Sequence, residues 1–366
     1  MAVRTVGILG LGLIGGSLAK ALRFRLGARH IFAVDKSPQS IKEAVDDGVI
    51  EAGSTEIDAR ILECDILFIC TPVKTSMAFI DEFLHSVKPG CILTDVCSTK
   101  GEIIDYINSL EQAPCFIGGH PMAGSEKTGY TAGSAHLFEN AYYMLCPANS
   151  ATQEAVAFLK EIIAGIGAIP VIMDAKEHDR ITGSISHFPH VVASALVNLV
   201  QKTDTPDARM QMLAAGGFKD ITRIASSSPE MWENIVMSNK EQVLSILDSF
   251  TDLLGEFKAQ LLEEDHQGIF SFFESSKLYR DSFSSNAKGL LPSVHEIVVD
   301  VVDKPGIIGE IATLLGKYGI NIKNMNISNS REFEQGCLRI TLPDVESMQA
   351  SLDLLIESGY SVLRVE

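Results

Sequence analysis

Short apolar runs alternate with amphipathic stretches through the first 174 residues of the chain. The four clearest runs are residues 6–9, 31–34, 66–69 and 92–94, and each is apolar almost throughout rather than at every second position. Such runs are typical of strands buried on both faces, because helices cover each side of a parallel sheet. Residues 1–174 are therefore predicted to form a doubly wound α/β domain.

Helical patterns replace the strand pattern after Asp174. Asp174 and Glu177 have the spacing of a capping box, which predicts a helix that runs past His178 toward residue 200. At positions 205–206 and 228–229 a hydroxyl residue precedes a proline, and each pair predicts a further helix start. Residues 175–285 are therefore predicted to form an all-α helical domain.

A regular apolar seam follows residues 239–242, whose Asn and Gln predict another helix start. The seam consists of Val243, Leu247, Phe250, Leu254, Phe257 and Leu261. Spacings of three and four residues place these side chains on one helix face, which has to pack against a second helix. That second helix belongs either to the same bundle or to another subunit, and the pattern leaves both open.

A third region follows a change in composition. From Ser275 to Ser293 the chain is rich in Ser, Asn, Lys, Gly and Pro, which predicts a linker. Beyond it, strand patterns at 297–301, 320–322, 337–342 and 361–365 are separated by a turn at 303–306 and by helical patterns at 307–315 and 345–355. The order β-α-β-β-α-β predicts a ferredoxin-like unit over residues 293–366.

Length, charge and cysteine usage narrow the class of protein. A chain of 366 residues suggests two or three domains, and its net charge of −17 repels a phosphate backbone, so we expect no nucleic-acid partner. The seven cysteines form no Cys-x-x-Cys pair. The longest apolar run, residues 190–200, falls short of the ~18 residues of a membrane span, and no signal-peptide pattern precedes the first strand. We expect a soluble, cytoplasmic protein with no membrane partner.

A glycine motif carries the first chemistry. Gly10, Gly12 and Gly15 form the motif G-x-G-x-x-G between the first strand and a helix. Gly10 allows a tight turn, Gly12 lets the backbone approach a pyrophosphate, and Gly15 lets the helix pack closely on the strand. Asp35 lies 20 positions after Gly15, at the end of the second strand, where a carboxylate binds ribose hydroxyls and repels a 2′-phosphate. The motif predicts a Rossmann-type domain that binds NAD rather than NADP, although Lys36 beside Asp35 could soften that preference.

Four further segments carry more polar residues than packing requires. They are residues 95–101, 118–126, 186–190 and 216–223. The first two follow predicted strands, and ligands bind at the carboxyl ends of strands in open α/β sheets. Taken singly, these residues also have structural explanations, such as a histidine in a turn or in the core, or a surface pair of Asp220 with Arg223.

Taken together behind the glycine motif, these segments resemble the prephenate dehydrogenase family. The resemblance extends over nearly the whole chain. Its most specific parts are His-Pro-Met-Ala-Gly-Ser-Glu at 120–126 and Gly-Phe-x-Asp-x-x-Arg at 217–223. Residues 293–366 resemble an ACT domain, an amino-acid-sensing module that is fused to some members of this family.

The resemblance implies roles for individual residues. His120 is the proton acceptor, Ser98 orients the substrate hydroxyl beside it, and Arg223 binds a substrate carboxylate. The other substrate-binding positions that it implies are Glu126 and Asp220 around that Arg, Ser186, His190 and Gly216 at the side-chain end, and Trp232 near the site.

The implied reaction is the oxidation of prephenate by NAD to 4-hydroxyphenylpyruvate in tyrosine biosynthesis. Hydride leaves C4 of prephenate while the 4-hydroxyl loses its proton, and loss of the ring carboxylate as CO2 then aromatises the ring, so no metal is needed. An imidazole with a pKa of about 6.5 suits that proton abstraction at neutral pH.

Two other functions stay open. Arogenate dehydrogenase acts on a substrate with an ammonium in place of the keto group, and a cationic or donor imidazole at His190 would favour the keto acid. A non-catalytic sensor of NAD and amino acids belongs to another class, and the intact set of Ser98, His120 and Arg223 argues against it.

Regulation and assembly follow from the same resemblance. An ACT domain implies feedback inhibition by tyrosine near the turn at 303–306, where polar side chains such as Asn321 would meet the charged ends of an amino acid. A purely dimerising role is the alternative for this domain. The seam and the family both favour a homodimer through the helical domain, and which subunit's pocket Arg223 serves is left open.

Overall fold

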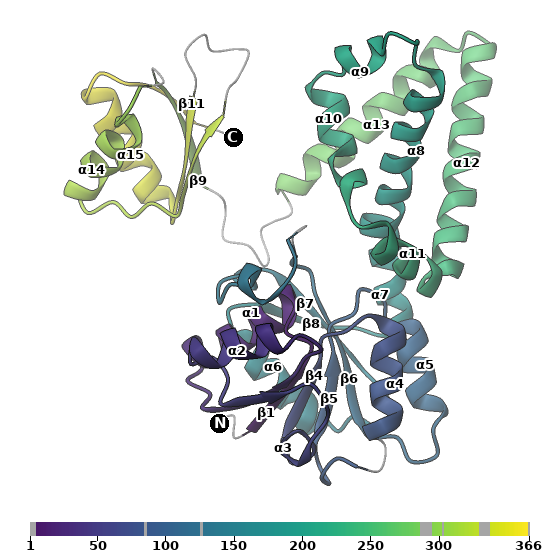
Figure 1. Ribbon diagram of the computed structural model, residues 1–366. Coiled ribbons are helices and arrows are strands. Elements are labelled where there is room, and N and C mark those ends of the chain that lie inside the picture. Colours follow the sequence, from purple (N-terminus) through teal and green to yellow (C-terminus); the bar gives the residue numbers. More distant parts are fainter. Residues whose placement is uncertain are drawn as a thin grey trace. The chain divides into compact units, whose positions relative to one another are not determined.

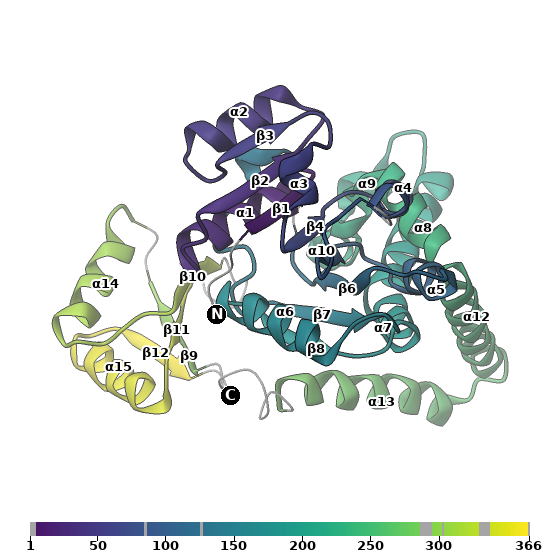
Figure 2. The same ribbon diagram turned by 90° about the horizontal axis from the view of Figure 1, so that it is seen from below.

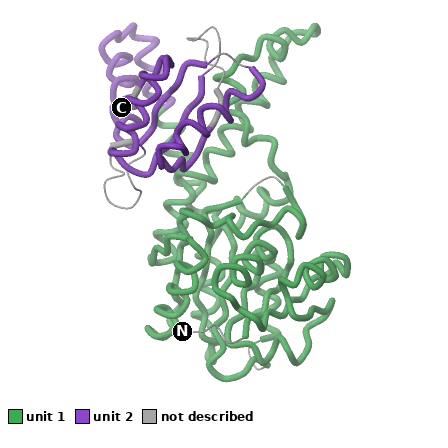
Figure 3. Tube along the Cα trace, turned by 90° about the vertical axis from the view of Figure 1, so that its left-hand side faces the viewer, with its two compact units in different colours: residues 1–253 green, residues 254–366 purple. Residues whose placement is uncertain are grey.

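The computed structural model describes residues 5–83, 86–124, 127–285, 295–301, 304–328 and 337–364. The chain divides into two compact units, residues 1–253 and 254–366, which Figure 3 colours separately. The division falls inside one helix, α12 (Lys240–Leu262).

The first unit begins with an eight-stranded sheet. Its strands are β1 (Thr5–Leu9), β2 (His30–Val34), β3 (Ala52–Ser54), β4 (Ile66–Ile69), β5 (Ile92–Asp95), β6 (Cys115–Pro121), β7 (Tyr142–Pro147) and β8 (Ile169–Ile172). They lie in the order β3-β2-β1-β4-β5-β6-β7-β8. All four apolar runs singled out in the sequence coincide with strands, and β1 and β4 are buried along almost their whole length. The predicted α/β fold is confirmed.

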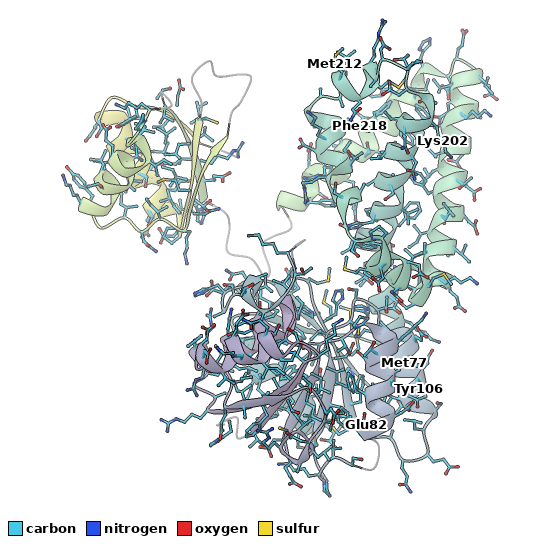
Figure 4. The ribbon with its side chains drawn as sticks, viewed as in Figure 1. Met77, Glu82, Tyr106, Lys202, Met212 and Phe218 are labelled. Carbon is cyan, nitrogen blue, oxygen red and sulfur yellow. The ribbon has the colours of Figure 1, made fainter. Side chains whose placement is uncertain are left out.

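Helices cover both faces of this sheet (Figures 1 and 2). They are α1 (Leu13–Arg25), α2 (Pro38–Asp46), α3 (Ala59–Leu62), α4 (Val73–Phe83), α5 (Gly101–Ser109) and α6 (Gln153–Gly165). One core cluster joins α1 and α6 to one face, and a second joins α4 and α5 to the other. Met77 of α4 and Tyr106 of α5, which Figure 4 labels, pack at the edge of the second cluster. Alternating strand residues enter opposite clusters, as the pleat requires.

One pair of strands departs from the predicted parallel arrangement. β7 runs antiparallel to β6, whereas the other neighbours in the sheet are parallel. Parallel neighbours need a crossover connection, usually a helix. Among the described residues between β6 and β7 the only helical segment is η1 (Tyr130–Ala132), a single 3-10 turn, so the chain turns back beside β6. The helix α6 restores a parallel crossover from β7 to β8.

The helix predicted after Asp174 is present but is interrupted. The Asp174 side chain caps α7 (Ala175–Thr182), as predicted. A π-helical turn, η2 (Gly183–His187), then separates α7 from α8 (Phe188–Thr203). Pro189 explains the interruption, because a proline has no N–H and its ring clashes with the carbonyl four residues earlier.

Four shorter helical segments complete the first unit before α12. They are α9 (Arg209–Leu213), α10 (Gly216–Thr222), η3 (Arg223–Ser226) and α11 (Pro229–Ser238). Ser228 caps α11, as predicted. The predicted start at Thr205 is wrong: α9 begins later, and the Asp204 carboxylate accepts the N–H groups that enter it. Asn239 precedes α12, but its side chain makes contacts elsewhere and does not cap the helix.

The apolar seam lies on α12 as predicted, and much of it faces solvent. The side chains of Leu247, Leu254 and Leu261 are 40%, 50% and 53% exposed. Phe250 packs on Phe188, with ring centroids 5.1 Å apart. Despite the length of α12, no helix in the described part of the chain has the length and apolarity to cross a membrane.

The second unit contains the end of α12, then α13 (His266–Ser285) and a small α+β fold. The linker predicted from Ser275 is wrong as far as Ser285, because α13 continues through it. Serine hydroxyls bond back to helix carbonyls there, as Ser275 does to Phe272, so a serine-rich sequence is compatible with the helix. The rest of the predicted linker, residues 286–293, lies outside the described residues.

The small fold has the predicted β-α-β-β-α-β order. Its elements are β9 (His295–Asp300), α14 (Ile307–Lys317), β10 (Asn324–Ser328), β11 (Cys337–Leu342), α15 (Val345–Glu357) and β12 (Ser361–Arg364). The antiparallel sheet has the order β10-β11-β9-β12, and both helices pack on one face (Figure 1). The strand predicted at 320–322 is wrong: Ile320 and Ile322 pack against the core, and pairing begins at Asn324, opposite Thr341. Asp303 of the predicted turn is outside the described residues.

Candidate active site

The glycine loop lies between β1 and α1. Gly10 has a φ of +95°, which favours glycine, and Gly15 is buried where α1 begins. A Cβ at Gly15 would stand 1.9 Å from the carbonyl oxygen of Gly10, whereas a Cβ at Gly12 would meet no heavy atom within 4 Å. Gly15 is therefore required by the packing of helix on strand, and Gly12 borders open space at the N-terminus of α1.

Asp35 stands at the carboxyl end of β2 and holds this loop. Its Oδ2 accepts a hydrogen bond of 2.6 Å from the backbone N–H of Leu11, and its Oδ1 accepts one of 2.7 Å from Ser37. Gly10 donates its own N–H to Val34, at the end of β2. The carboxylate predicted to meet a ribose is thus placed directly beside the glycine loop.

Contacts along the carboxyl edge of the sheet connect the loop to Ser98. A Cβ at Gly10 would lie 2.6 Å from the carbonyl oxygen of Cys70, after β4. The carbonyl of the next residue, Thr71, accepts the thiol of Cys97 at 3.4 Å, and Ser98 follows, half-buried. Burial raises the pKa of Cys97 to about 12, so this thiol stays neutral.

A fully buried ion pair lies beneath the Ser98 loop. The ammonium of Lys100 contacts Asp95, the last residue of β5, and neither side chain is exposed. Asp95 also accepts the backbone N–H groups of Cys97, at 2.9 Å, and of Gly119, at 3.0 Å. One carboxylate therefore joins the Ser98 loop to strand β6, beside the predicted proton acceptor.

His120 lies on β6 and is buried. Its Nδ1 is 2.8 Å from Nε2 of His178, whose Nδ1 is 2.8 Å from Oδ1 of Asp179. Asp179 also accepts the backbone N–H groups of Lys100, at 2.8 Å, and Gly101, at 2.7 Å, where α5 begins. Three side chains from β6 and α7 thus form a continuous chain that ends on a helix N-terminus.

The surroundings of His120 keep its imidazole neutral. Burial lowers its pKa well below 6.5, and the neighbouring charge of Lys100 acts in the same direction. A neutral imidazole at pH 7 is able to accept a proton.

A second cluster surrounds His187 in the π-helical turn. Asn239 donates to the backbone carbonyl of Asp179 at 2.8 Å and lies 3.0 Å from Nδ1 of His187, which joins the start of α12 to α7. Burial lowers the pKa of His187 to about 4. Nε2 of His187 and the indole nitrogen of Trp232 are buried and have no hydrogen-bond partner within the described residues. The two rings meet edge to face.

His190 extends this cluster toward Arg223. Its ring stacks on Trp232 with centroids 3.5 Å apart, and its Nδ1 is 2.9 Å from the carbonyl of Ser186, which can only accept. Burial lowers the pKa of His190, and the nearby charge of the exposed Arg223 lowers it further. The expectation of a cationic or donor imidazole facing a ligand is therefore wrong. At neutral pH the second ring nitrogen of His190 is an acceptor.

The structure does not bring every predicted residue into these clusters. Gly216 and Asp220 lie exposed on α10, which also carries Phe218 (Figure 4). The ion pairs of the described residues do not join Asp220 to Arg223. Glu126 lies outside the described residues.

Sequence reasoning missed four residues that surround His120 or connect to it through hydrogen bonds, and we call this group with His120 the His120 centre. The four are Asp95, Lys100, His178 and Asp179. Asp95 and Lys100 flank Ser98 in a segment that was singled out, and their charges in an otherwise buried setting were the available signal. His178 and Asp179 sit in the first turns of α7, where the pattern indicated only a capped helix. No spacing in the sequence connects them to His120, which lies on a different element.

Family models match most of the chain. One described as prephenate dehydrogenase, nucleotide-binding domain, matches residues 18–172, and one described as prephenate dehydrogenase, dimerization domain, matches residues 174–275. An ACT domain model matches residues 295–345.

Relatives are similar over nearly their full length. The prephenate dehydrogenase of Bacillus subtilis (strain 168) is 38% identical over 92% of this chain and 91% of its own, and that of Lactococcus lactis is 35% identical over 95% and 96%. The prephenate dehydrogenase of Aquifex aeolicus, solved with hydroxyphenyl propionate and NAD+, is 32% identical with a TM-score of 0.72, over 77% of this chain and 99% of its own. The arogenate dehydrogenase of Synechocystis is 27% identical, with a TM-score of 0.68, over 76% and 99%.

Proposed function

This chain belongs to the prephenate dehydrogenase family, and from that premise we propose that it oxidises prephenate with NAD to 4-hydroxyphenylpyruvate and CO2. The observation that carries the proposal is the buried, neutral His120 on the strand next to the one that leads into Ser98, at the sheet edge that carries the glycine loop. A cytoplasmic location is part of the proposal and fits the unbridged thiols of Cys64, Cys91 and Cys146.

The residues around the loop fit a dinucleotide. The open space at Gly12 and the N-terminus of α1 suit a pyrophosphate. The position of the Asp35 carboxylate beside the glycine loop supports its assignment as the acceptor of the ribose hydroxyls. A carboxylate at that position repels a 2′-phosphate, which supports NAD over NADP. When bound, the nicotinamide supplies the acceptor for the substrate's hydride.

His120 is the proposed base. It takes the proton of the substrate's 4-hydroxyl while Ser98 orients that hydroxyl. Because its pKa is lowered, His120 is unprotonated at pH 7 and no proton has to leave before the reaction begins. The bond to the ring carboxylate then breaks, its electrons aromatise the ring, and CO2 leaves.

The substrate is a dianion, and donors near Arg223 suit it. The guanidinium of Arg223 is proposed to bind one carboxylate. Nε2 of His187 and the indole N–H of Trp232 support the same assignment, because buried polar atoms normally have partners and the described residues supply none for these two. The further positions proposed for substrate binding are Glu126, Ser186, His190, Gly216 and Asp220.

Arogenate dehydrogenation is the second candidate, and one observation favours it. The second ring nitrogen of His190 is an acceptor at neutral pH, because Nδ1 donates to Ser186 and burial keeps the ring neutral. An acceptor suits the ammonium of arogenate better than the keto group of prephenate. His190 therefore does not discriminate against arogenate, and the choice of prephenate rests on the relatives.

Steady-state assays of reduced cofactor formation test the proposal. The wild-type enzyme is expected to reduce NAD with prephenate, with a kcat/KM higher than with NADP or with arogenate. A higher kcat/KM for arogenate would establish the second candidate. No reduced cofactor with either substrate would overturn both and favour the sensor function.

Feedback inhibition by tyrosine through residues 295–364 is also proposed. This region forms a ferredoxin-like fold with a core of its own, and Asn321 is exposed after α14. The full-length enzyme is expected to lose activity as tyrosine is added, and a chain that ends at Ser285 is expected to stay active and lose most of this inhibition. Equal inhibition of both chains would place tyrosine at the active site instead.

A homodimer through the helical domain completes the proposal. The exposed apolar side chains of Leu254, Leu261 and Phe273 support it, because they leave the seam of α12 and its neighbour α13 accessible to a second copy. Sedimentation at micromolar concentration is expected to give twice the chain mass, and a monomeric mass would refute this part.

A further inference from the structure

We propose that His178 and Asp179 are positioning residues that determine which ring nitrogen of His120 accepts the substrate's proton. The inference rests on the proposed function in taking His120 as the base. Both residues lie on α7.

The direction of each hydrogen bond in the chain follows from Asp179. Its two oxygens lie near three donors: the backbone N–H of Lys100, that of Gly101, and Nδ1 of His178. A backbone N–H can only donate, so the carboxylate accepts from both. Acting as the acceptor for His178 as well, it places the hydrogen of that imidazole on Nδ1.

The position of hydrogen on His178 determines which nitrogen of His120 carries hydrogen. With its hydrogen on Nδ1, His178 presents the lone pair of Nε2, which lies 2.8 Å from Nδ1 of His120. Nδ1 of His120 must then donate, and the lone pair of His120 is on Nε2. If both hydrogen bonds ran in the opposite direction, Nε2 of His120 would carry hydrogen and could not take a proton from the substrate.

Packing holds Asp179 and His178 in this geometry. Asp179 is 5% exposed and His178 is fully buried. The N-terminus of α5 favours a carboxylate electrostatically, and the Asn239 side chain fixes the backbone carbonyl of Asp179. Thr182 bonds to the backbone carbonyl of His178 at 2.9 Å. The pair is therefore anchored on several sides.

The charges around His120 show why such a pair matters. Three titratable groups lie around His120: His178 from α7, His187 from the π-helical turn, and Lys100 from the start of α5, whose charge opposes a positive charge on His120. Lys100 is neutralised in part by Asp95. The carboxylate of Asp179 reaches His120 through His178, so it stabilises the imidazolium that forms when the hydroxyl proton is taken.

The substitution Asp179→Asn tests the direction of the hydrogen bonds from His120 through His178 to Asp179. The new amide can donate to Nδ1 of His178, which reverses both hydrogen bonds. We expect kcat to fall by roughly 10²–10⁴, while KM for prephenate and the Kd for NAD stay within about threefold. Asp65→Asn is the matched control, because Asp65 also accepts a backbone N–H, from Thr5, and pairs with Lys88, outside the proposed site. We expect it to leave kcat unchanged.

Two substitutions of His178 separate positioning from support of the fold. The side-chain oxygen of Gln in His178→Gln can accept from Nδ1 of His120, whereas His178→Leu offers no acceptor. We therefore expect Gln to retain more kcat than Leu. Both break the link through which the carboxylate of Asp179 stabilises the imidazolium of His120, so the acid limb of kcat/KM moves to lower pH. A role limited to capping α5 would leave that limb in place.

Nitrogen NMR of the histidine side chains in the full-length protein reads the tautomer without substrate. We expect hydrogen on Nδ1 of His120 in the wild type and on Nε2 in Asp179→Asn. Hydrogen on Nε2 in the wild type, or an Asp179→Asn enzyme with kcat within about threefold, would overturn the proposal. If Asp179→Asn does not fold, the wild-type spectrum and the two His178 variants decide. If the wild type shows the expected tautomer but never oxidises prephenate, the proposed function fails and the hydrogen-bond chain stands.

Discussion

The glycine loop and the His120 centre lie in the same unit but are assembled in different ways. The loop is six consecutive residues, and one carboxylate, Asp35, fixes it through a backbone N–H. The His120 centre draws on β6, α7 and the start of α5, and its bonds join residues 58 and 79 positions apart. The first is a property of a short sequence, and the second is a property of the packed domain.

This difference determines how each region responds to change. In the loop, glycine is required wherever backbone meets backbone, so the constraint is steric and local. Around His120, each polar side chain satisfies another one, and removal of one member leaves a buried partner unpaired. Substitutions in the loop should therefore act through steric clashes, and substitutions in the His120 centre should act through the loss of hydrogen bonds and charges.

The largest effect is expected for His120→Asn. Loss of the base should lower kcat by roughly 10²–10⁴, with the Kd for NAD unchanged, because the loop does not depend on this imidazole. Initial rates and an NAD titration measure the two quantities. A kcat within about threefold of wild type would remove His120 from the reaction, and a large loss of NAD binding would break the distinction between the two regions.

Two alanine substitutions in the loop sharpen the steric half of the comparison. Gly15→Ala puts a methyl group 1.9 Å from a backbone oxygen, which should cost about 1–3 kcal/mol of stability and weaken NAD binding. Gly12→Ala meets no heavy atom within 4 Å, so the melting temperature should stay the same while NAD affinity falls about tenfold. Calorimetry and NAD titration test the pair. Equal melting temperatures for both variants would contradict the steric argument.

The local features were the ones that the sequence predicted well. The glycine loop and the helix caps at Asp174 and Ser228 each depend on residue types within a few positions of one another. Asp35 is separated from the loop in sequence, and the pairing of β1 with β2 brings the two together. Four strands of the large sheet and the β-α-β-β-α-β order of the small fold followed from apolar periodicity, because burial on one or two faces leaves a direct pattern.

The features that failed depend on what lies elsewhere in the fold. The reversal at β7 follows a connection whose described residues form only the single 3-10 turn η1, which is too short for a crossover. The helix α13 extends through a serine-rich stretch because hydroxyls bond to its own carbonyls. The partnership of His120 with His178 exists only after α7 packs beside β6. The neutral state of His190 likewise arises from burial and from Arg223, neither of which is visible in residues 186–190.

Arg223→Ala should have a smaller effect on activity than loss of the base, and it should weaken the binding of substrate only. Removal of a hydrogen bond to a charged group costs about 1.5–3 kcal/mol, which corresponds to roughly a ten- to hundredfold rise in KM for prephenate. NAD affinity should not change. Arg209→Ala is the control, because Arg209 is also exposed and, within the described part of the chain, forms an ion pair with Asp207 in the same helical region. An unchanged KM in Arg223→Ala with lowered stability would support a structural role for this residue.

The smallest expected effect is a pH dependence of stability that belongs to the His120 centre and not to the loop. The folded pKa of His120 is well below 6.5, and that of His187 is about 4, in both cases first because of burial. Between about pH 6.5 and pH 4 the unfolded chain therefore binds more protons at these two positions than the folded chain does. The stability they confer is complete above pH 6.5 and is lost as the pH falls, with a slope of about 1.4 kcal/mol per pH unit for each proton. Urea unfolding at several pH values measures this slope, and His187→Gln should make it shallower by up to one proton. If the slope of His187→Gln matches that of the wild type across this range, the buried imidazole of His187 does not contribute, and the acid sensitivity of the protein has to arise from other groups.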